Sequence, residues 1–236
     1  MGWTAVADVR TNGLGQVAGL SRRDGAIQEI RRAIVKGVLQ PGDKVTEVGL
    51  STQLGVSRPT LREALNQLSI EGLLTQEPYR GMYVAELSPG DHLDLAVTRH
   101  ALDMLAIDAI LEDGSGRRMA ALDRHWARFE AVEADPDPLV QHEAHVAFHR
   151  GVWEASENRL LLRVWPVIEA HLTVSLAQDQ AIRSDPARAM TQHHALIDAV
   201  HSRDRARTEQ AFREHTIGSA KELIEIMEHA GTAVPA

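Results

Sequence analysis

The 236-residue sequence contains no cysteine, and it has no uninterrupted apolar run long enough to cross a bilayer. Without cysteine no disulfide framework can form, which fits a reducing compartment. The chain also lacks a charged-then-apolar segment at its start, so we expect neither membrane insertion nor export. These absences predict a soluble, cytoplasmic protein.

Motifs of common enzyme classes are missing as well. No glutamate follows a candidate metal-binding histidine as it does in zinc proteases, and there is neither a glycine-rich phosphate loop nor a Ser-His-Asp arrangement. We therefore do not expect an enzyme.

Positive charge is scarce, since the formal net charge is −8. Residues 21–87 carry nine Lys or Arg against eight Asp or Glu, whereas residues 88–236 carry fifteen against twenty-four. The breakers in residues 88–91 predict a linker between a first domain over 21–87 and a second over 92–230. Residues 1–20 hold four glycines without periodicity and predict a flexible N-terminal arm.

The segment from Leu50 to Leu65 predicts a helix, a tight turn and a second helix. Gly55 permits the positive φ that such a turn needs, and Ser57 suits the N-cap of the following helix. Leucines at helical spacing anchor one face of that helix on a core: Leu61, Leu65 and Leu68. The exposed N-terminal end then carries Arg58, Thr60 and Arg62, and a helix-turn-helix places this end in the major groove of DNA.

The flanking sequence predicts the rest of a DNA-binding fold. Upstream, an apolar stripe of Ile27, Ile30, Ile34 and Val38 predicts a further helix. Downstream, two short strand-like segments flank residues 78–81, which have turn composition. Three helices followed by a two-stranded wing form a winged helix-turn-helix.

This part of the chain resembles the GntR family of bacterial transcription regulators. The matching residues are Ile34, Gly37, Leu39, Pro41, Gly42, Glu47, Gly55 to Leu65, Leu68, Glu71, Gly72, Leu73, Arg80, Gly81 and Val84. The resemblance implies that Arg58, Thr60 and Arg62 contact bases and phosphates and that Gly81 on the wing approaches the minor groove. We assign DNA binding to these four residues and to Thr46, Ser57 and Arg80. One position departs from the family: Val48 stands where a basic residue is common.

The arginines support the same conclusion by their chemistry. A guanidinium can donate two parallel hydrogen bonds to guanine, a contact worth about 1–3 kcal/mol of discrimination. A domain with nearly balanced charge cannot hold DNA by bulk attraction, so we expect two copies on a short palindromic operator. The partners predicted are thus double-stranded DNA and a second copy of this chain.

The second domain is predicted to be all-helical. Apolar residues recur every three or four positions, and breakers at 113–116, 135–138, around Asn158, 184–186 and 202–204 divide it into about six helices. The fold class is therefore mainly α: a winged helix followed by an antiparallel helical bundle.

This second domain resembles the FCD ligand-binding domain of the FadR subfamily. The matching segments include residues 99–103, 147–149 with Asn158, and His193 and His215. In metal-binding members an Asp and three His point into the bundle, and the three histidines map to His149, His193 and His215. The resemblance places a pocket arginine at Arg99, so we assign Arg99, Asp103 and Asn158 to a small organic-acid effector.

His145 occupies the position of the family's metal-binding Asp, four residues before His149. Either four histidines hold a divalent transition metal such as Zn or Ni, or the metal is absent and the histidines form a hydrogen-bonding pocket. Arg99 likewise has two interpretations, an effector ligand or a surface residue paired with Asp103. His171, His201 and His229 are interpreted as ordinary histidines.

Regulation by a carboxylate metabolite at the metal is the favoured function, with repression as the family's common mode. Two alternatives remain: a metal-free regulator that responds to a larger acyl ligand, and a metal-dependent hydrolase with a DNA-binding domain.

Overall fold

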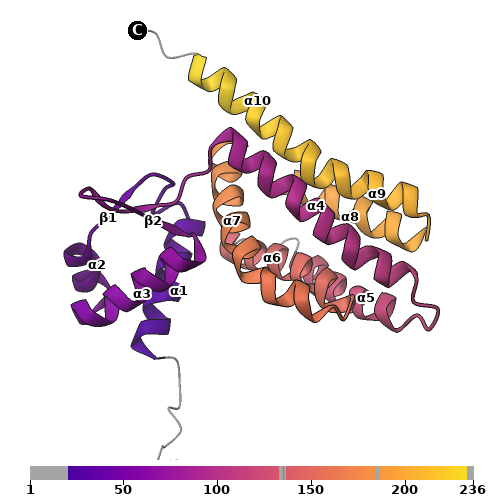
Figure 1. The fold of residues 1–236 in the computed structure, drawn as a ribbon, viewed down its shortest axis with the longest axis horizontal. Coiled ribbons are helices and arrows are strands. Elements are labelled where there is room, and N and C mark those ends of the chain that lie inside the picture. The colour runs from indigo at the N-terminus through magenta and orange to yellow at the C-terminus, as the bar shows by residue number, and fades with distance from the viewer. Residues whose placement is uncertain (1–20, 133–134, 136, 184–185, 233–236) are drawn as a thin grey trace, which may run out of the picture.

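The computed structural model describes residues 21–132, 135, 137–183 and 186–232. It divides into an N-terminal part with a small sheet and a larger, wholly helical C-terminal part (Figure 1). The proposed N-terminal arm and parts of the predicted breaks at 135–138 and 184–186 lie outside the described residues. The mainly helical fold class predicted from the sequence is confirmed.

The N-terminal part is a winged helix-turn-helix. A three-stranded antiparallel sheet of order β1-β3-β2 covers its three helices, so β1 adds a strand to the predicted two-stranded wing. Its elements are α1 (Arg22–Val35), β1 (Lys44–Val45), α2 (Glu47–Leu54), α3 (Arg58–Glu71), β2 (Leu74–Glu77) and β3 (Gly81–Val84).

The turn between α2 and α3 forms as its sequence dictates. Gly55 takes a left-handed conformation with φ 63°, and the side chain of Ser57 accepts a hydrogen bond from the Thr60 backbone N–H. Pro59 lies in the first turn, where its missing N–H has no partner to lose. The predicted leucines on the inner face of α3 are all buried: Leu61, Leu65 and Leu68.

One expectation in this domain is wrong. Val38 was assigned to the apolar stripe of the first helix, but α1 ends at Val35 and the Val38 side chain is 73% exposed. Gly37, with φ 68°, turns the chain after the helix, and Leu39 packs on the core instead. The local turn therefore overrides the helical spacing.

The C-terminal part is a bundle of long helices. The last three elements run on without a break, so the described residues of the bundle form six continuous helical segments, in line with the predicted number of about six. The elements are α4 (Pro89–Leu111), α5 (Arg117–Glu130), α6 (Pro138–Ala155), α7 (Arg159–Arg183), α8 (Pro186–His201), α9 (Arg205–Arg213), the π-helical segment η1 (Glu214–Gly218) and α10 (Ser219–Thr232).

The predicted linker over 88–91 forms the cap and first turn of α4. The Ser88 hydroxyl accepts from the Asp91 backbone N–H, and the Asp91 carboxylate accepts from the Ser88 backbone N–H. This reciprocal capping box starts α4 directly after the winged helix. The two domains are thus joined through a helix end.

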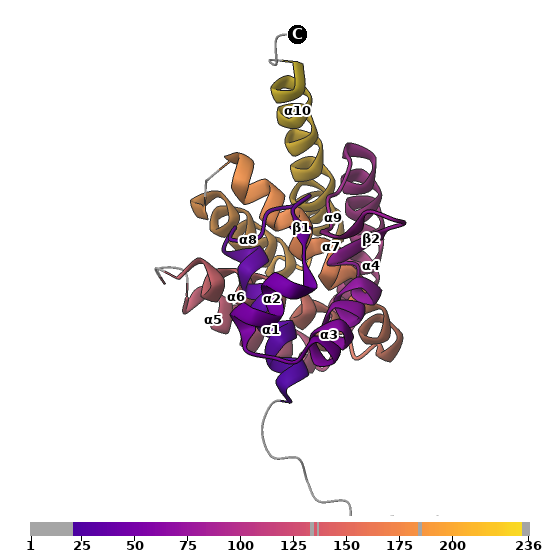
Figure 2. The ribbon, with the colours of Figure 1, turned by 90° about the vertical axis from the view of Figure 1, so that its left-hand side faces the viewer.

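Helix α7 belongs to both domains. It stands between the winged helix and the rest of the bundle (Figure 1), and its Ala170 and Val174 are buried in the core of the winged helix. On the opposite side, Leu172 packs in the bundle core. Viewed from the left-hand side of Figure 1, the winged helix lies in front of the bundle and α10 projects beyond both (Figure 2).

By length and composition, residues Arg159–Gln180 of α7 could also cross a membrane, which departs from the sequence-based expectation. A helix that packs in two cores meets the same criterion, so this is weak evidence for a membrane span.

Candidate DNA-binding surface and candidate metal centre

The N-terminal end of α3 presents the predicted DNA-contacting residues to solvent. Arg58 is exposed in the first turn, and the Thr60 hydroxyl lies 2.8 Å from the Ser57 hydroxyl. Ser57 thus both caps α3 and holds Thr60. Thr46 is the N-cap of α2, although its side chain makes no capping hydrogen bond.

Arg62 is paired with a carboxylate that the sequence analysis did not connect with it. Its Nε and Nη2 donate to the two carboxylate oxygens of Glu47 at 3.1 and 2.9 Å. These hydrogen bonds from Arg62 hold the pKa of Glu47 below its usual value. The two residues lie fifteen positions apart on different helices, so no helical spacing could have predicted the pair.

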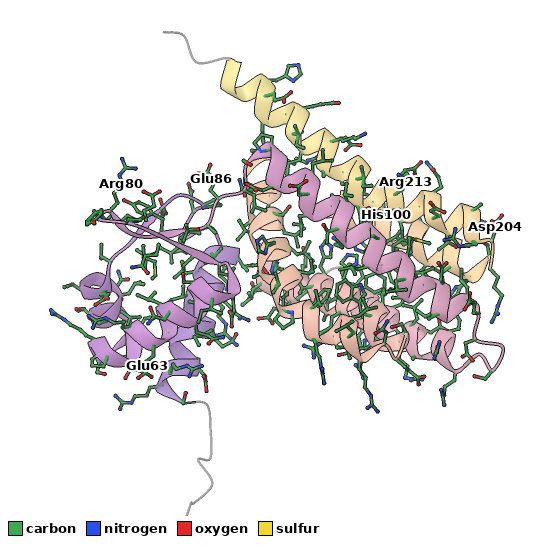
Figure 3. The ribbon with its side chains drawn as sticks, viewed as in Figure 1. Glu63, Arg80, Glu86, His100, Asp204 and Arg213 are labelled. Carbon is green, nitrogen blue, oxygen red and sulfur yellow. The ribbon has the colours of Figure 1, made fainter. Side chains whose placement is uncertain are left out.

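The wing ends in an exposed turn. Figure 3 shows Arg80 at the outer end of the wing, where its Nη1 donates to Glu77 at 3.2 Å. Gly81 begins β3 with φ 112°, a conformation that favours glycine. Tyr79 is fully exposed with φ 64°, and the sequence analysis did not single it out. Val48, at the departure from the family, is exposed on α2.

The four histidines predicted as metal ligands converge in the bundle. His145 and His149 come from α6, His193 from α8 and His215 from η1, and their candidate ligand atoms all lie within 4.8 Å of one another. The Nε2 atom of His149 is the centre of the group. It lies 3.1 Å from Nε2 of His145, 2.9 Å from that of His193 and 3.2 Å from that of His215.

Hydrogen bonding alone cannot account for this arrangement. A neutral ring nitrogen carries either one proton or one lone pair, so His149 Nε2 can pair with only one of its neighbours, which are these three nitrogens and Nη2 of Arg99 at 3.0 Å. Nitrogens bound at about 2.0–2.1 Å to a tetrahedral zinc ion would lie about 3.3 Å apart. The separations around His149 are close to that value, so the four imidazoles fit a transition-metal ion.

Burial keeps these ligands in the form that a metal needs. It lowers the pKa of His145 and of His149 well below the ordinary histidine value, and the nearby Arg99 cation and neighbouring histidines lower both further. The imidazoles of His145 and His149 are therefore neutral near pH 7, and a neutral imidazole has a lone pair for a metal.

The π-helical segment places His215 in the group. It interrupts an otherwise continuous α-helix between α9 and α10, and such single-turn insertions rotate the following residues relative to an ideal helix. His215 lies inside the segment and is 9% exposed. Nothing in the sequence around His215 indicates this change in backbone geometry.

Arg99 is buried rather than on the surface. Its Nε lies 3.3 Å from the Asp103 carboxylate, and its Nη2 lies 2.9 and 3.0 Å from the ring nitrogens of His149. The indole N–H of Trp153 donates to the same carboxylate at 2.6 Å. Burial raises the pKa of Asp103, and its pairing with Arg99 opposes that shift.

A cavity of about 110 Å³ opens beside the histidines. Arg99 and three of the four histidines line it: His145, His193 and His215. Two residues assigned to the effector do not line it. Asp103 lies behind Arg99, and Asn158 accepts hydrogen bonds from the backbone N–H groups of Leu160 and Leu161 at the start of α7. Asn158 therefore has a structural environment as a helix cap.

Four further histidines lie outside the four-histidine group. His201 and His229 are exposed, and His171 is half-buried beside Gly72, at the contact with the winged helix. His142 precedes His145 on α6, and burial lowers its pKa to about 4. These side chains contribute no atom to the four-histidine group.

The structure thus joins a winged helix to a helical bundle that contains a polar cavity. The family model for bacterial regulatory proteins of the gntR family matches residues 22–84, and that for the FCD domain matches residues 94–217. The chain belongs to the GntR family of transcriptional regulators and to its FCD-containing branch.

Individual proteins similar to this chain include regulators from several bacteria. A "Probable D-xylose utilization operon transcriptional repressor" of Paenarthrobacter nicotinovorans is 31% identical over 193 residues, which cover 77% of this chain and 80% of that protein. The HTH-type transcriptional regulator LutR of Bacillus subtilis is 26% identical over 202 residues, covering 77% and 92%. McbR/YncC of E. coli has the same fold, with a TM-score of 0.67 at 18% identity over 88% of this chain and 99% of that one. The matched families and relatives are regulators rather than enzymes.

Proposed function

We propose that this regulator binds a short palindromic operator as a homodimer in the cytoplasm and releases it when a small carboxylate binds at a divalent metal ion in the C-terminal domain. The observation that carries the proposal is the convergence of four imidazoles beside a cavity that Arg99 also lines. Repression is favoured because one similar protein is named as a repressor.

In this proposal His145, His149, His193 and His215 hold the metal, which would attract a carboxylate oxygen to an open coordination position. Arg99 contributes a second cationic contact to the same carboxylate. Because all four protein ligands are neutral, they cancel none of the charge of a divalent ion. An anionic effector is thus favoured over a neutral one.

The cavity favours this effector over a long acyl chain. Its volume of about 110 Å³ is below the 300–1,000 Å³ typical of pockets for drug-sized ligands. A hydrolase would need a general base beside the metal, but the nearby acid of α6, Glu143, is exposed to solvent, and Asp179 in the cavity lining is paired with Arg183. Both alternatives therefore have less support than the small-carboxylate regulator.

For DNA, we assign base and phosphate contacts to Arg58, Thr60 and Arg62 on α3, with Ser57 and Thr46 beside them and Arg80 and Gly81 on the wing. The winged helix has almost no net positive charge, so strong binding requires a second copy on the operator.

Exposed apolar residues on two packed helices suggest where the copies meet. Leu160, Val164 and Val167 form a row on α7 and are 66%, 38% and 54% exposed. Val97 and Leu105 on the adjacent α4 are 49% and 52% exposed. We assign these residues to the dimer interface. Light scattering should find a dimer for the wild type and a monomer for Val167→Glu, and a dimeric Val167→Glu protein would contradict this assignment.

A pair of variants tests the central proposal. An operator is first selected from random duplexes by the wild-type protein, and affinity is measured by fluorescence anisotropy with zinc content determined in parallel. Arg58→Ala should lose operator recognition and keep the metal. His149→Ala should keep operator binding and lose both the metal and the response to small carboxylates such as lactate and citrate.

Three results would contradict the proposed function. Sequence-specific binding by both Arg58→Ala and Arg62→Ala would exclude α3 as the recognition helix. A wild-type protein without affinity for zinc, nickel or cobalt would exclude the metal. Release of the operator by a long-chain acyl-CoA, with no effect of any small carboxylate, would favour the acyl alternative.

A further inference from the structure

A second polar group lines the cavity at the end away from the four histidines. His92, in the first turns of α4, is 2% exposed, and its Nδ1 lies 3.0 Å from the Ser175 hydroxyl on α7. Its Nε2 is buried and has no hydrogen-bond partner within the described part of the chain. A buried polar atom without a partner is unfavourable, so a ligand that supplied one would gain binding free energy.

The position of His92 on the helix separates this group from the metal end. His92 and Arg99 are both buried on one face of α4, seven residues and about 10 Å apart along the helix axis. On α4, Leu95 and Ala96 lie between them and also line the cavity, together with apolar side chains of other helices and the polar Gln192, Thr216 and Ser219. His92 with Ser175 is therefore a polar group of the lining that is separate from Arg99.

The chemistry of the distal end favours a neutral group. Burial lowers the pKa of His92, so its ring is neutral and one nitrogen donates while the other accepts. A ligand hydroxyl can do either and suits both tautomers. Asp179 also lines the cavity and is paired with Arg183 at 2.7 Å, so a second carboxylate would approach an existing negative charge.

We propose that His92 and Ser175 form a distal subsite, and that the effector carries a carboxylate at one end and a neutral hydroxyl or similar hydrogen-bonding group at the other. This inference rests on the proposed function, which supplies the site for the carboxylate. It adds a specificity determinant: the subsite selects among small carboxylates by length and by the polarity of the far end.

Three linear acids of equal chain length test the subsite. Hexanoate, 6-hydroxyhexanoate and adipate differ only in the far end, and calorimetry on the zinc-loaded, full-length protein measures each affinity. The wild type should bind 6-hydroxyhexanoate about five- to tenfold more tightly than hexanoate, which corresponds to one buried hydrogen bond. Adipate should bind more weakly than 6-hydroxyhexanoate.

Variants assign the preference to named residues. His92→Phe should bind the two monocarboxylates equally, and Ser175→Ala should reduce the preference. His201→Phe, the same change at an exposed histidine, should keep the full preference. His92→Gln replaces His92→Phe if the latter fails to fold, and it should retain part of the preference.

Outcomes separate the two proposals. Equal wild-type affinity for hexanoate and 6-hydroxyhexanoate, or an unchanged preference in both His92→Phe and Ser175→Ala, would overturn the subsite alone. Binding of acetate without either six-carbon monocarboxylate would also overturn it, because the cavity would not accept the chain. If neither these acids nor acetate, lactate and citrate bound the zinc-loaded protein, the carboxylate-responsive function would fail as well.

Discussion

Two arginine–carboxylate pairs show how differently the two domains use the same chemistry. Arg62 and Glu47 form a bidentate pair on the surface of the winged helix, with side chains 63% and 38% exposed. Arg99 and Asp103 form a pair inside the bundle, with side chains 8% and 0% exposed. Water and salt screen the first pair and hardly reach the second.

The difference in exposure determines whether the arginine of each pair can change partners or is held in place. An exposed ion pair contributes little to stability, so in the proposed function Arg62 can leave Glu47 for DNA at low cost. A buried pair that loses one partner leaves an uncompensated charge in a medium that solvates it poorly. Asp103 therefore fixes Arg99 beside the cavity, whereas Glu47 holds Arg62 only until a stronger anion replaces it.

Breaking the buried pair should have the largest effect on stability. We expect Asp103→Ala to lower the free energy of unfolding by about 3–5 kcal/mol, because it strands the Arg99 cation and removes the acceptor of Trp153. Urea unfolding measures the change. The double variant Arg99→Met/Asp103→Leu should recover most of it, since no buried charge remains. A loss below about 1 kcal/mol in Asp103→Ala would show that the pair is not an anchor.

Removing the metal should weaken the bundle by a smaller amount. With free zinc at 100 times its dissociation constant, bound zinc stabilises the folded protein by about 2.7 kcal/mol, and chelation should remove that contribution. Urea unfolding with zinc and with EDTA measures the difference. His149→Ala should show no zinc effect, whereas the exposed His201→Ala should behave as the wild type. An equal zinc effect in both variants would place the ion elsewhere.

The contact between the domains should have an intermediate effect. Gln178 on α7 accepts from the Leu87 backbone N–H at 3.0 Å and donates to its carbonyl at 3.2 Å, at the end of the winged helix. Gln178→Ala leaves both buried groups without partners and should cost about 1–3 kcal/mol. Hydrogen exchange at the Leu87 amide should accelerate. Gln53→Ala, an exposed control on α2, should change neither the free energy of unfolding nor the exchange rate. Unchanged hydrogen exchange at Leu87 in Gln178→Ala would show that this contact does not couple the two domains.

The winged helix was largely predictable because its signals are local. Gly55, Ser57 and the leucines of α3 act through turn geometry, capping and helical spacing, and each of these is visible within a few residues of sequence. The added strand β1 was missed because two residues, Lys44–Val45, carry too little pattern to identify a strand.

The bundle was harder to predict because one of its buried faces is polar. Apolar spacing predicted a helical segment here, but α4 exposes the apolar Val97 and Leu105 and buries His92, Arg99 and Asp103. Partners distant in sequence, such as Trp153 for Asp103 and Ser175 for His92, make that face possible. No local rule detects such partners.

The smallest effect on stability belongs to the exposed pair, where the readout is DNA binding. Glu47→Gln removes a negative charge beside Arg62 and should leave the urea midpoint nearly unchanged. Affinity for a random duplex should rise about threefold, and the salt dependence should steepen by up to about one phosphate contact. Glu209→Gln, which alters an exposed acid paired with Arg205 on α9, should change neither quantity.

The ratio of operator to random-duplex affinity in Glu47→Gln distinguishes two roles for the exposed pair. If Glu47 only occupies Arg62 in the absence of DNA, the ratio of operator to random-duplex affinity should fall slightly, because random DNA gains as much as the operator or more. If operator binding collapses while random-duplex affinity stays constant, Glu47 orients Arg62 toward a base. In that case the exposed pair would position its arginine as Asp103 positions Arg99, and burial would no longer distinguish the two.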